Sequence, residues 1–524
     1  MTSLRPLSCR AFGVGCLALF GLGVAVRWAV GLGDDGLGGQ DPWAYETAAR
    51  TTAAWLVGHA AAPTGFFWPL GYPVLGALLG LLTGLPEATA LRTLSLVLGA
   101  ATGPLLALAV ALAHGPRARR AGLLAGVVVA ASAASALAGA EVMADAAMAF
   151  WLVAAAAATA PVLRAQGEDG AVSRGRALLL AAGAGAALGL AVVTRQAALV
   201  GAPAVGIAWL LAAGRRRVGW DAVVLFGLCA GVPLLAQLAI DPGRPGALEH
   251  AWLRNWRPWH AVMRSFDTPD GHADYAFPQG IYALFPVLHP GYLAPPLLLF
   301  LLRGVRRGWC GTDGCAVGPF ATLFWAQWLG VAALLFAGMP YQNFRFGLCA
   351  LPAAAALFGL GAVGRGRLAA AALAFGLLWT AAWTPRMAQR HLQSRQERRA
   401  LVQSVAEAAT RVAASAFDPP RPPLLVAFEL TLDLRHRQGL DVIELYDLRP
   451  GGPEAESRLR ELAEAATRRP LVLVVDDTDL GAQWAGTPIA AALARLGAAY
   501  DAGPPERVGA YRVARLEPRS RATR

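Results

Sequence analysis

Two carboxylates beside an apolar run are the first residues in this chain whose types and spacing could do chemistry. Glu141 and Asp145 lie four positions apart in AEVMADAAMAFW, so they share one face if this segment is helical. Paired carboxylates at such a place favour a metal site or a shifted pKa, and the alternative is a polar edge at a membrane surface. A third carboxylate, Asp41, precedes Pro42 in GQDPWAYETAAR, where it could cap a helix that lies on a membrane surface.

An arginine between two apolar runs is the next candidate. Arg195 lies in VVTRQAA, and an ionised side chain at membrane depth is costly enough to indicate a function. The alternative is an arginine that extends its guanidinium to the lipid headgroups. Arg27 and Arg92 occupy similar positions, with a weaker signal.

A polar segment over 241–283 gathers aromatic, histidine and arginine side chains. Rings that stack on sugars and guanidinium groups that hold phosphate would suit a sugar phosphate. The alternative is an aromatic belt at the membrane interface. The candidate substrate-binding residues of this segment are Trp252, Arg254, Trp256, Arg257 and His260.

These residues must be positioned by membrane-spanning elements, because the composition excludes most other classes. Hydrophobic residues make up 56% of the 524 residues and charged residues 15%, against about 25% charged in soluble proteins. Such a chain is not disordered, a coiled coil or an ordinary soluble enzyme. Its net charge of +12 comes from arginines that do not cluster on one soluble face, so we expect no nucleic-acid partner.

Eleven apolar runs approach the roughly 20 residues that a membrane span requires. They lie at 11–32, 88–113, 121–138, 146–163, 177–194, 196–213, 218–240, 284–302, 316–338, 345–363 and 368–384. The segment 69–85 is apolar but is interrupted by Pro and Gly, so we interpret it as interfacial or re-entrant.

Arginine-rich loops set the expected orientation. The loops 114–120, 164–176, 214–217, 303–314 and 364–367, with Arg5 and Arg10, hold 16 of the 25 arginines before residue 385. The positive-inside rule places these loops and the N-terminus in the cytoplasm. An odd number of spans then places the C-terminal part outside.

The distribution of charge predicts the domain organisation. Residues 385–524 hold 39 of the 80 charged residues. We therefore expect a mostly helical membrane domain over 1–384, a helical and Pro-rich linker over 385–423, and a small extracytoplasmic α/β domain over 424–524. Expected strands lie at 424–430, 441–447, 471–477 and 507–516, with helices at 453–467 and 484–497.

The order of motifs over 11–384 resembles the C-type glycosyltransferase superfamily (GT-C). The most similar pattern is the phospholipid carrier-dependent branch, glycosyltransferase family 39, with the protein O-mannosyltransferases and the bacterial transferases that add aminoarabinose to lipid A. One span precedes the acidic loop GQDPWAYETAAR, followed by FFWPLGYPVLGALLG and ALRTLSLVLGA. Then come AEVMADAAMAFW, LGLAVVTRQAALVGAP and YQNFRFGLCALPAAA.

The resemblance implies roles for individual residues. Asp41 matches an aspartate thought to act as base or to position the acceptor, and Asp145 an acidic position linked to metal or donor binding. Arg195 and Arg345 match basic positions near the lipid phosphate. Glu141, at a variable position, is a further catalytic candidate, and Arg92 a further phosphate-binding candidate. Asp41 and Asp145 are also the candidate ligands of a divalent metal.

This chain departs from the family pattern at two positions. Pro42 stands where the family often has Glu, which bears on the metal requirement. Trp68 stands where a basic residue often precedes the Pro-rich motif, which bears on the contact with the donor phosphate.

We therefore expect a glycosyltransferase of the inner or plasma membrane. It would move a hexose or pentose from a polyprenyl-phosphate donor to a glycan, lipid or protein acceptor on the outer face of the cell envelope. A transporter or flippase of a lipid-linked or anionic substrate is the alternative, although the spans lack the matched interior acids and bases of a polar path. A non-catalytic membrane scaffold is the third possibility.

Overall fold

The computed structural model describes residues 7–165, 172–242, 254–268, 271–293, 298–310, 319–363, 366–414, 421–452, 454–481 and 484–519. The chain divides into two compact units. The first comprises Met1–Gly36, Tyr45–Met263 and Phe277–Arg390, and the second comprises Leu37–Ala44, Arg264–Ala276 and His391–Arg524. Each unit therefore contains segments that are far apart in the sequence.

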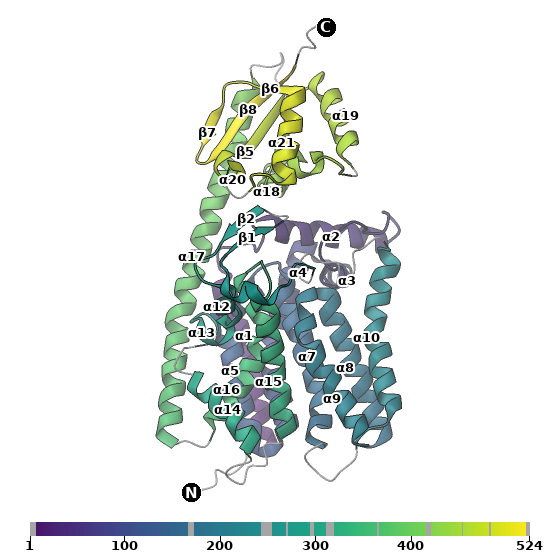
Figure 1. The fold of residues 1–524 in the computed structure, drawn as a ribbon, viewed down its shortest axis with the longest axis vertical. Helices are drawn as coiled ribbons and strands as arrows, with labels where there is room; N and C mark the ends of the chain where they lie inside the picture. Colours follow the sequence, from purple (N-terminus) through teal and green to yellow (C-terminus); the bar gives the residue numbers. More distant parts are fainter. Residues whose placement is uncertain are drawn as a thin grey trace. The chain divides into compact units, whose positions relative to one another are not determined.

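Long apolar helices that run side by side form most of the first unit (Figure 1). α8 packs on α7 and α10, and α4 packs on α1, α5 and α7. These long helices are α1 (Cys9–Val30), α4 (Glu87–His114), α7 (Ala144–Ala165), α8 (Arg174–Thr194), α10 (Trp220–Ile240) and α15 (Pro319–Ala337). The η2 turn (Gln196–Val200) and α9 (Ala202–Gly214) together form a further candidate span. Seven such spans among the described residues confirm a multi-pass membrane protein.

Shorter elements complete the first unit. α3 (Gly71–Thr83) has 13 residues, and at about 1.5 Å per residue it is too short to cross a bilayer. The others are η1 (Pro116–Ala118), α5 (Arg119–Ala131), α6 (Ala133–Ala140), η3 (Pro258–Val262), α12 (Gln279–Ala283), α13 (Phe285–Leu288), α14 (Leu298–Cys310), η5 (Phe344–Cys349) and α16 (Leu351–Ala362).

The predicted count of eleven spans is not confirmed. The described residues contain seven candidate spans, or eight if the bent pair α5 and α6 counts as one. The run 284–302 is divided among α13, α14 and residues outside the described part, and the run 345–363 is divided between η5 and α16. Prolines such as Pro286 and Pro352 lie at the start of these short helices, so neither run forms one uninterrupted helix.

A bend of 56° separates α5 from α6 around Ser132, and buried side chains satisfy the backbone there. The amide of Ala134 donates to Gly291 O at 2.9 Å, so the carbonyl of Ala130 lacks its usual helical donor. Arg27 donates to that carbonyl at 3.3 Å and to Ser135 Oγ at 2.6 Å. The bend is therefore stabilised by specific contacts. Such contacts are needed because every buried backbone polar group in a membrane domain must be paired.

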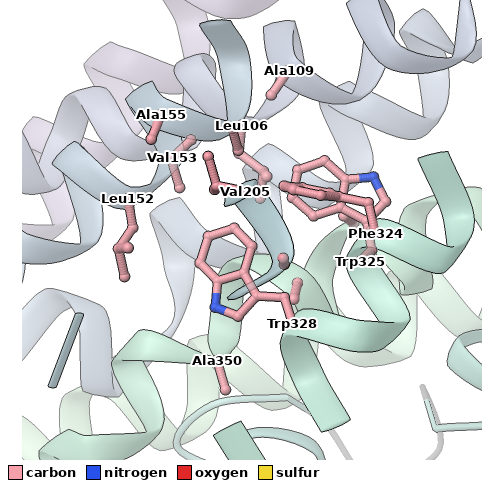
Figure 2. Packing of buried hydrophobic residues seen from close by; sticks show 14 of the residues in the cluster. Leu106, Ala109, Leu152, Val153, Ala155, Val205, Phe324, Trp325, Trp328 and Ala350 are labelled. Atoms are coloured by element: carbon pink, nitrogen blue, oxygen red, sulfur yellow. The ribbon is translucent and has the colours of Figure 1, made fainter. Parts of the chain in front are cut away.

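The core of the first unit combines large rings with very small residues. Trp209, Trp325 and Trp328 are fully buried, and Figure 2 shows Trp325 and Trp328 packed among Leu106, Leu152 and Val205. Elsewhere the helix backbones touch. A Cβ on Gly103, Gly189 or Gly361 would crowd or overlap a carbonyl oxygen of the neighbouring helix. Small residues at such contacts are how membrane helices gain close packing.

The second unit contains a mixed sheet with the order β4-β3-β5-β8-β6, and β7 pairs with β8. β3 (Leu424–Ala427) lies parallel to β4 (Asp441–Glu444) and β5 (Leu471–Asp476), whereas β8 (Tyr511–Pro518) is antiparallel to β5, β6 (Tyr500–Ala502) and β7 (Glu506–Val508). Its helices are α18 (Thr431–Gln438), α19 (Ala455–Ala466), α20 (Asp477–Gly481) and α21 (Pro488–Ala499), with a turn η6 (Leu445–Leu448). The predicted small α/β sheet is confirmed, although α18, α20 and β6 were not predicted. The predicted strand 507–516 is divided into the antiparallel strands β7 and β8.

Helices cover both faces of this sheet. α19 and α21 pack on the side chains of Leu424 and Val426. Val402 and Val405 of α17 (Gly366–Ala414) pack on the side of Leu425 and Ala427. Part of the segment 385–423 that the sequence assigns to a linker is therefore one layer of the second unit. A hairpin of β1 (Ser265–Thr268) and β2 (Gly271–Asp274) also belongs to this unit.

Candidate functional site

A buried ion pair joins two of the predicted residues in the first unit. Nη1 of Arg195 donates to Oδ2 of Asp145 at 2.9 Å, and the two side chains are 2% and 1% exposed. Nη1 of Arg345 lies 3.9 Å from the same oxygen, and this arginine is 26% exposed. Two guanidinium groups and one carboxylate give this cluster a net charge of about +1. A buried cluster with excess positive charge is suited to an anion.

Breaks in the helices position each member of the cluster. Arg195 follows the last residue of α8 and is extended, with φ −157°, before η2 begins. Arg345 lies in η5, whose first turn is capped by Asn343, and Oδ1 of Asn343 also accepts from Nε of Arg345 at 3.3 Å. Asp145 lies in the first turn of α7. All three side chains therefore leave the backbone where a helix begins or ends.

Side chains of α3 and α4 hold the segment that precedes Asp145. Oγ of Ser95 donates to the carbonyl of Met143 at 3.0 Å, and the hydroxyl of Tyr72 lies 2.7 Å from Ser95 Oγ. Both side chains are fully buried. Sequence reasoning missed Tyr72 and Ser95, although both fall within motifs that carry the family resemblance.

Trp68 contacts Arg195 through its ring. The guanidinium carbon of Arg195 lies 5.5 Å from the ring centroid. The residue that replaces a basic position of the family pattern thus makes a cation–π contact with a predicted phosphate-binding arginine. Such a contact can fix the plane of a guanidinium and is typically worth about 0.5–2 kcal/mol.

Arg92 and Glu141 have different surroundings from those of the Asp145 cluster. Nε of Arg92 donates to Ala140 O at 3.1 Å and its Nη2 to Gly31 O at 2.7 Å. Glu141 is the residue that follows α6 and is partly buried. In the described contacts Arg92 holds backbone carbonyls next to Glu141, which favours a structural role.

The predicted aromatic loop packs against the end of α15. Trp252 lies outside the described residues. The indole of Trp256 donates to Leu334 O at 3.4 Å, and Nδ1 of His260 lies 2.8 Å from Gly338 O. Arg254 and Arg257 are exposed.

Asp41 lies in the first turn of α2 (Gln40–Leu56). This helix begins two residues earlier than predicted, so Asp41 is inside the helix and not its cap. A carboxylate in a first turn is still favoured by the helix dipole. Asp41 belongs to the second unit, whereas Asp145 belongs to the first.

The two candidate ligands of the metal that the resemblance implies, Asp41 and Asp145, belong to different units. No group of three His, Cys, Asp or Glu side chains in the described part of the chain is arranged to hold a metal ion. Oδ2 of Asp145 faces two arginines, and only Oδ1 is buried without a hydrogen-bond partner among the described residues.

Acidic residues at the carboxyl ends of the sheet strands have local roles. Asp477 accepts from Nε of Arg512 at 3.0 Å, and Oδ1 of Asp476 accepts from the amide of Thr478. Burial raises the pKa of Glu444, at the end of β4, to about 7. These contacts indicate stabilisation of the sheet edge.

The comparisons with known proteins identify the fold. No protein-family model matches the chain, and no curated protein matches its sequence. The structure is similar to that of ArnT from Cupriavidus metallidurans bound to undecaprenyl phosphate, with a TM-score of 0.59 and 14% identity over 96% of this chain and 98% of that chain.

A second similar structure is the archaeal oligosaccharyltransferase AglB from Archaeoglobus fulgidus, in complex with an inhibitory peptide and a dolichol-phosphate. Its TM-score is 0.51, with 13% identity over 89% of this chain and 70% of that chain. At this level of identity the similarity concerns the fold. The resemblance seen in the order of motifs is confirmed at that level, and the chain has the C-type glycosyltransferase fold.

Proposed function

We propose that this protein is a membrane glycosyltransferase that moves a sugar from a polyprenyl-phosphate donor to an acceptor at the outer face of the membrane. The observation that carries the proposal is the buried Asp145 carboxylate shared by Arg195 and Arg345. ArnT and AglB support the donor class, because their structures contain undecaprenyl phosphate and dolichol-phosphate.

The charge balance of the cluster suits the leaving group of such a reaction. The oxygen of the acceptor forms a bond to the anomeric carbon while the bond from that carbon to the phosphate oxygen breaks. The phosphate leaves with one more negative charge than it carried in the donor. Arginines near that oxygen stabilise the transition state more than the ground state, which is the requirement for catalysis.

Asp145 and Asp41 have separate roles in this proposal. Asp145 orients Arg195 and Arg345, because its Oδ2 faces both guanidinium groups. Asp41 takes the proton of the acceptor as general base, as the resemblance implies. Arg345 is the more exposed of the two arginines, and we expect it to contact the donor phosphate.

The test is transfer of a radiolabelled sugar from a polyprenyl-phosphate donor by the purified full-length protein. We expect transfer by the wild type, and loss of about ten- to a hundredfold in donor affinity in Arg195→Gln, since one charge-assisted contact is worth about 1.5–3 kcal/mol. Arg195→Lys should keep part of the activity because the charge remains. Movement of the donor across the membrane without cleavage would favour the transporter alternative and overturn the proposal.

A paired variant separates phosphate binding from stability. Arg195→Gln alone leaves a buried carboxylate with a weaker partner, and such a loss typically costs about 3–5 kcal/mol. The double variant Asp145→Asn/Arg195→Gln removes both charges and allows an amide–amide hydrogen bond. It should fold and still lose donor binding. Arg174→Gln, which breaks an exposed ion pair with Asp221, is the matched control and should bind the donor normally.

A further inference from the structure

The segment Leu37–Ala44, which carries Asp41, is seated on the C-terminal part of the chain within the second unit. The indole Nε1 of Trp43 donates to Oδ1 of Asp433 at 2.9 Å. The same ring stacks on His436, with centroids 4.8 Å apart and planes 9° from parallel. Trp43 is thereby buried against α18, far along the sequence from its own helix.

Asp433 is the centre of a buried charge network. Its side chain is 2% exposed, and its Oδ2 accepts from Nε of Arg398 at 2.7 Å. Its Oδ1 accepts from Nε of Arg437 at 3.3 Å in addition to the indole of Trp43. A buried carboxylate is tolerated when it is paired and hydrogen-bonded in this way, and removing a partner is costly. Asp433, in α18, therefore binds a residue of α17 (Arg398) and a residue of the Asp41 segment (Trp43) at the same carboxylate.

Two further contacts hold the start of the same segment. Arg437 donates to the carbonyl of Leu37, and its guanidinium lies 5.2 Å from the Trp43 ring centroid. Gly38 packs closely against Arg395, so that a Cβ at this position would overlap the guanidinium. Asp41 thus lies between two points, Gly38 and Trp43, that are both fixed by the C-terminal part of the chain.

We infer that Trp43 and Asp433 are positioning residues for the transfer reaction, through which the C-terminal domain sets the place of Asp41. This inference rests on the proposed function, in which Asp41 is the general base. A base must lie within hydrogen-bond reach of the proton that it takes. A displacement of about 1 Å can cost roughly a hundredfold in rate. In the proposed function, Arg195 and Arg345 bind the donor phosphate. The donor KM should therefore not depend on the network around Asp433.

The experiment is a double-mutant cycle on the full-length protein with Trp43→Phe, Asp433→Asn and both together. Trp43→Phe keeps an aromatic ring and removes the indole donor. Each single variant should lower kcat about ten- to a hundredfold while the donor KM stays within about twofold. The double variant should be no slower than the slower single variant, because both substitutions act on the same Trp43–Asp433 contact. Phe removes the indole donor, and Asn removes the charge of the acceptor. Asp477→Asn, which breaks the Arg512 pair in the same unit, is the control and should leave kcat unchanged.

Hydrogen–deuterium exchange gives a readout that needs no activity. Amides of residues 37–44 should exchange faster in Asp433→Asn than in the wild type, and those of β5 should not change. Unchanged exchange, independent effects in the cycle, or an equal loss in Asp477→Asn would overturn the inference while leaving the proposed function standing. If the wild type transfers no sugar, the proposed function fails, and the positioning role fails with it.

Discussion

The carboxylate of Asp145 faces two guanidinium groups. In the proposed function, the residues that bind the phosphate are therefore distinct from the residue that takes a proton. An aspartate whose oxygen is held by arginines is a poor general base, because its lone pairs are already engaged. The base is therefore expected at another acid, and Asp41 is the residue that the order of motifs indicates.

Asp41→Asn should abolish transfer while the protein still folds. The amide keeps the size of the side chain and removes the base, which typically contributes about 10²–10⁴-fold. Steady-state transfer with saturating donor measures the loss in kcat, and the donor KM should be retained.

Asp35→Asn is the matched control for this variant, since Asp35 is an exposed acid six positions before Asp41. It should transfer at the wild-type rate. Normal turnover by Asp41→Asn would reduce Asp41 to a residue that only stabilises the start of α2.

Single residues were predictable where their chemistry is costly. Arg195 and Asp145 were identified from the sequence because a charged side chain beside an apolar run is energetically costly and therefore indicates a function. Trp68 was noticed only as a departure from the family pattern, and its contact with Arg195 was not predicted. Asp433 was not noticed, because an aspartate is common in soluble helices. Their roles depend on partners 127 and 390 positions away, at Arg195 and Trp43. Such pairings require the fold.

At the scale of elements, the bend between α5 and α6 precedes the segment that carries Asp145. The carbonyl of Ala131 accepts from Oγ1 of Thr384 at 3.3 Å, and that of Ala130 accepts from Arg27. Both donors come from other helices. The bend thus depends on two side chains that reach across the bundle, one from α1 and one from α17.

Thr384→Val should lower the stability of the detergent-purified protein by about 0.5–2 kcal/mol, the range typical of a side-chain hydrogen bond in a membrane. Val keeps the shape of Thr and removes the donor. Thermal unfolding followed by circular dichroism measures the change.

Thr380→Val provides the control within the same helix. Its hydroxyl bonds to Gly376 O in its own helix at 2.9 Å, so its loss should change stability little. An equal effect of the two variants would mean that the bend does not depend on Thr384.

Elements were predictable where an apolar run is uninterrupted and long enough to span a membrane, as in α1, α4, α8 and α10. They were not predictable where Pro, Gly or a tertiary partner interrupts an apolar run. The run 345–363 becomes a turn followed by the 12-residue α16, in which every residue is buried. A fully buried short helix and a membrane span have the same hydropathy, and only packing distinguishes them.

At the scale of the whole molecule, the arginine-rich loops predict the orientation in the membrane. Loops such as 114–120 and 214–217 are rich in Arg, which favours the cytoplasm. The N-terminus should therefore be cytoplasmic and the C-terminal domain extracytoplasmic.

Reporter fusions test this orientation. Alkaline phosphatase joined after residue 524 should be active, and green fluorescent protein at the same place should be dark. Fusions within 114–120 should behave in the opposite way. A fluorescent fusion at residue 524, without phosphatase activity, would contradict the predicted orientation.

The glycines at helix contacts have a consequence for how this protein can evolve. A Cβ at Gly103, Gly189 or Gly361 has no free volume, because a neighbouring carbonyl occupies that place. Any single-base change in the first two positions of a glycine codon replaces glycine by a larger residue or by a stop. Mutational tolerance should therefore be lowest at these glycines, and higher at exposed residues of α10 such as Leu228 and Leu235.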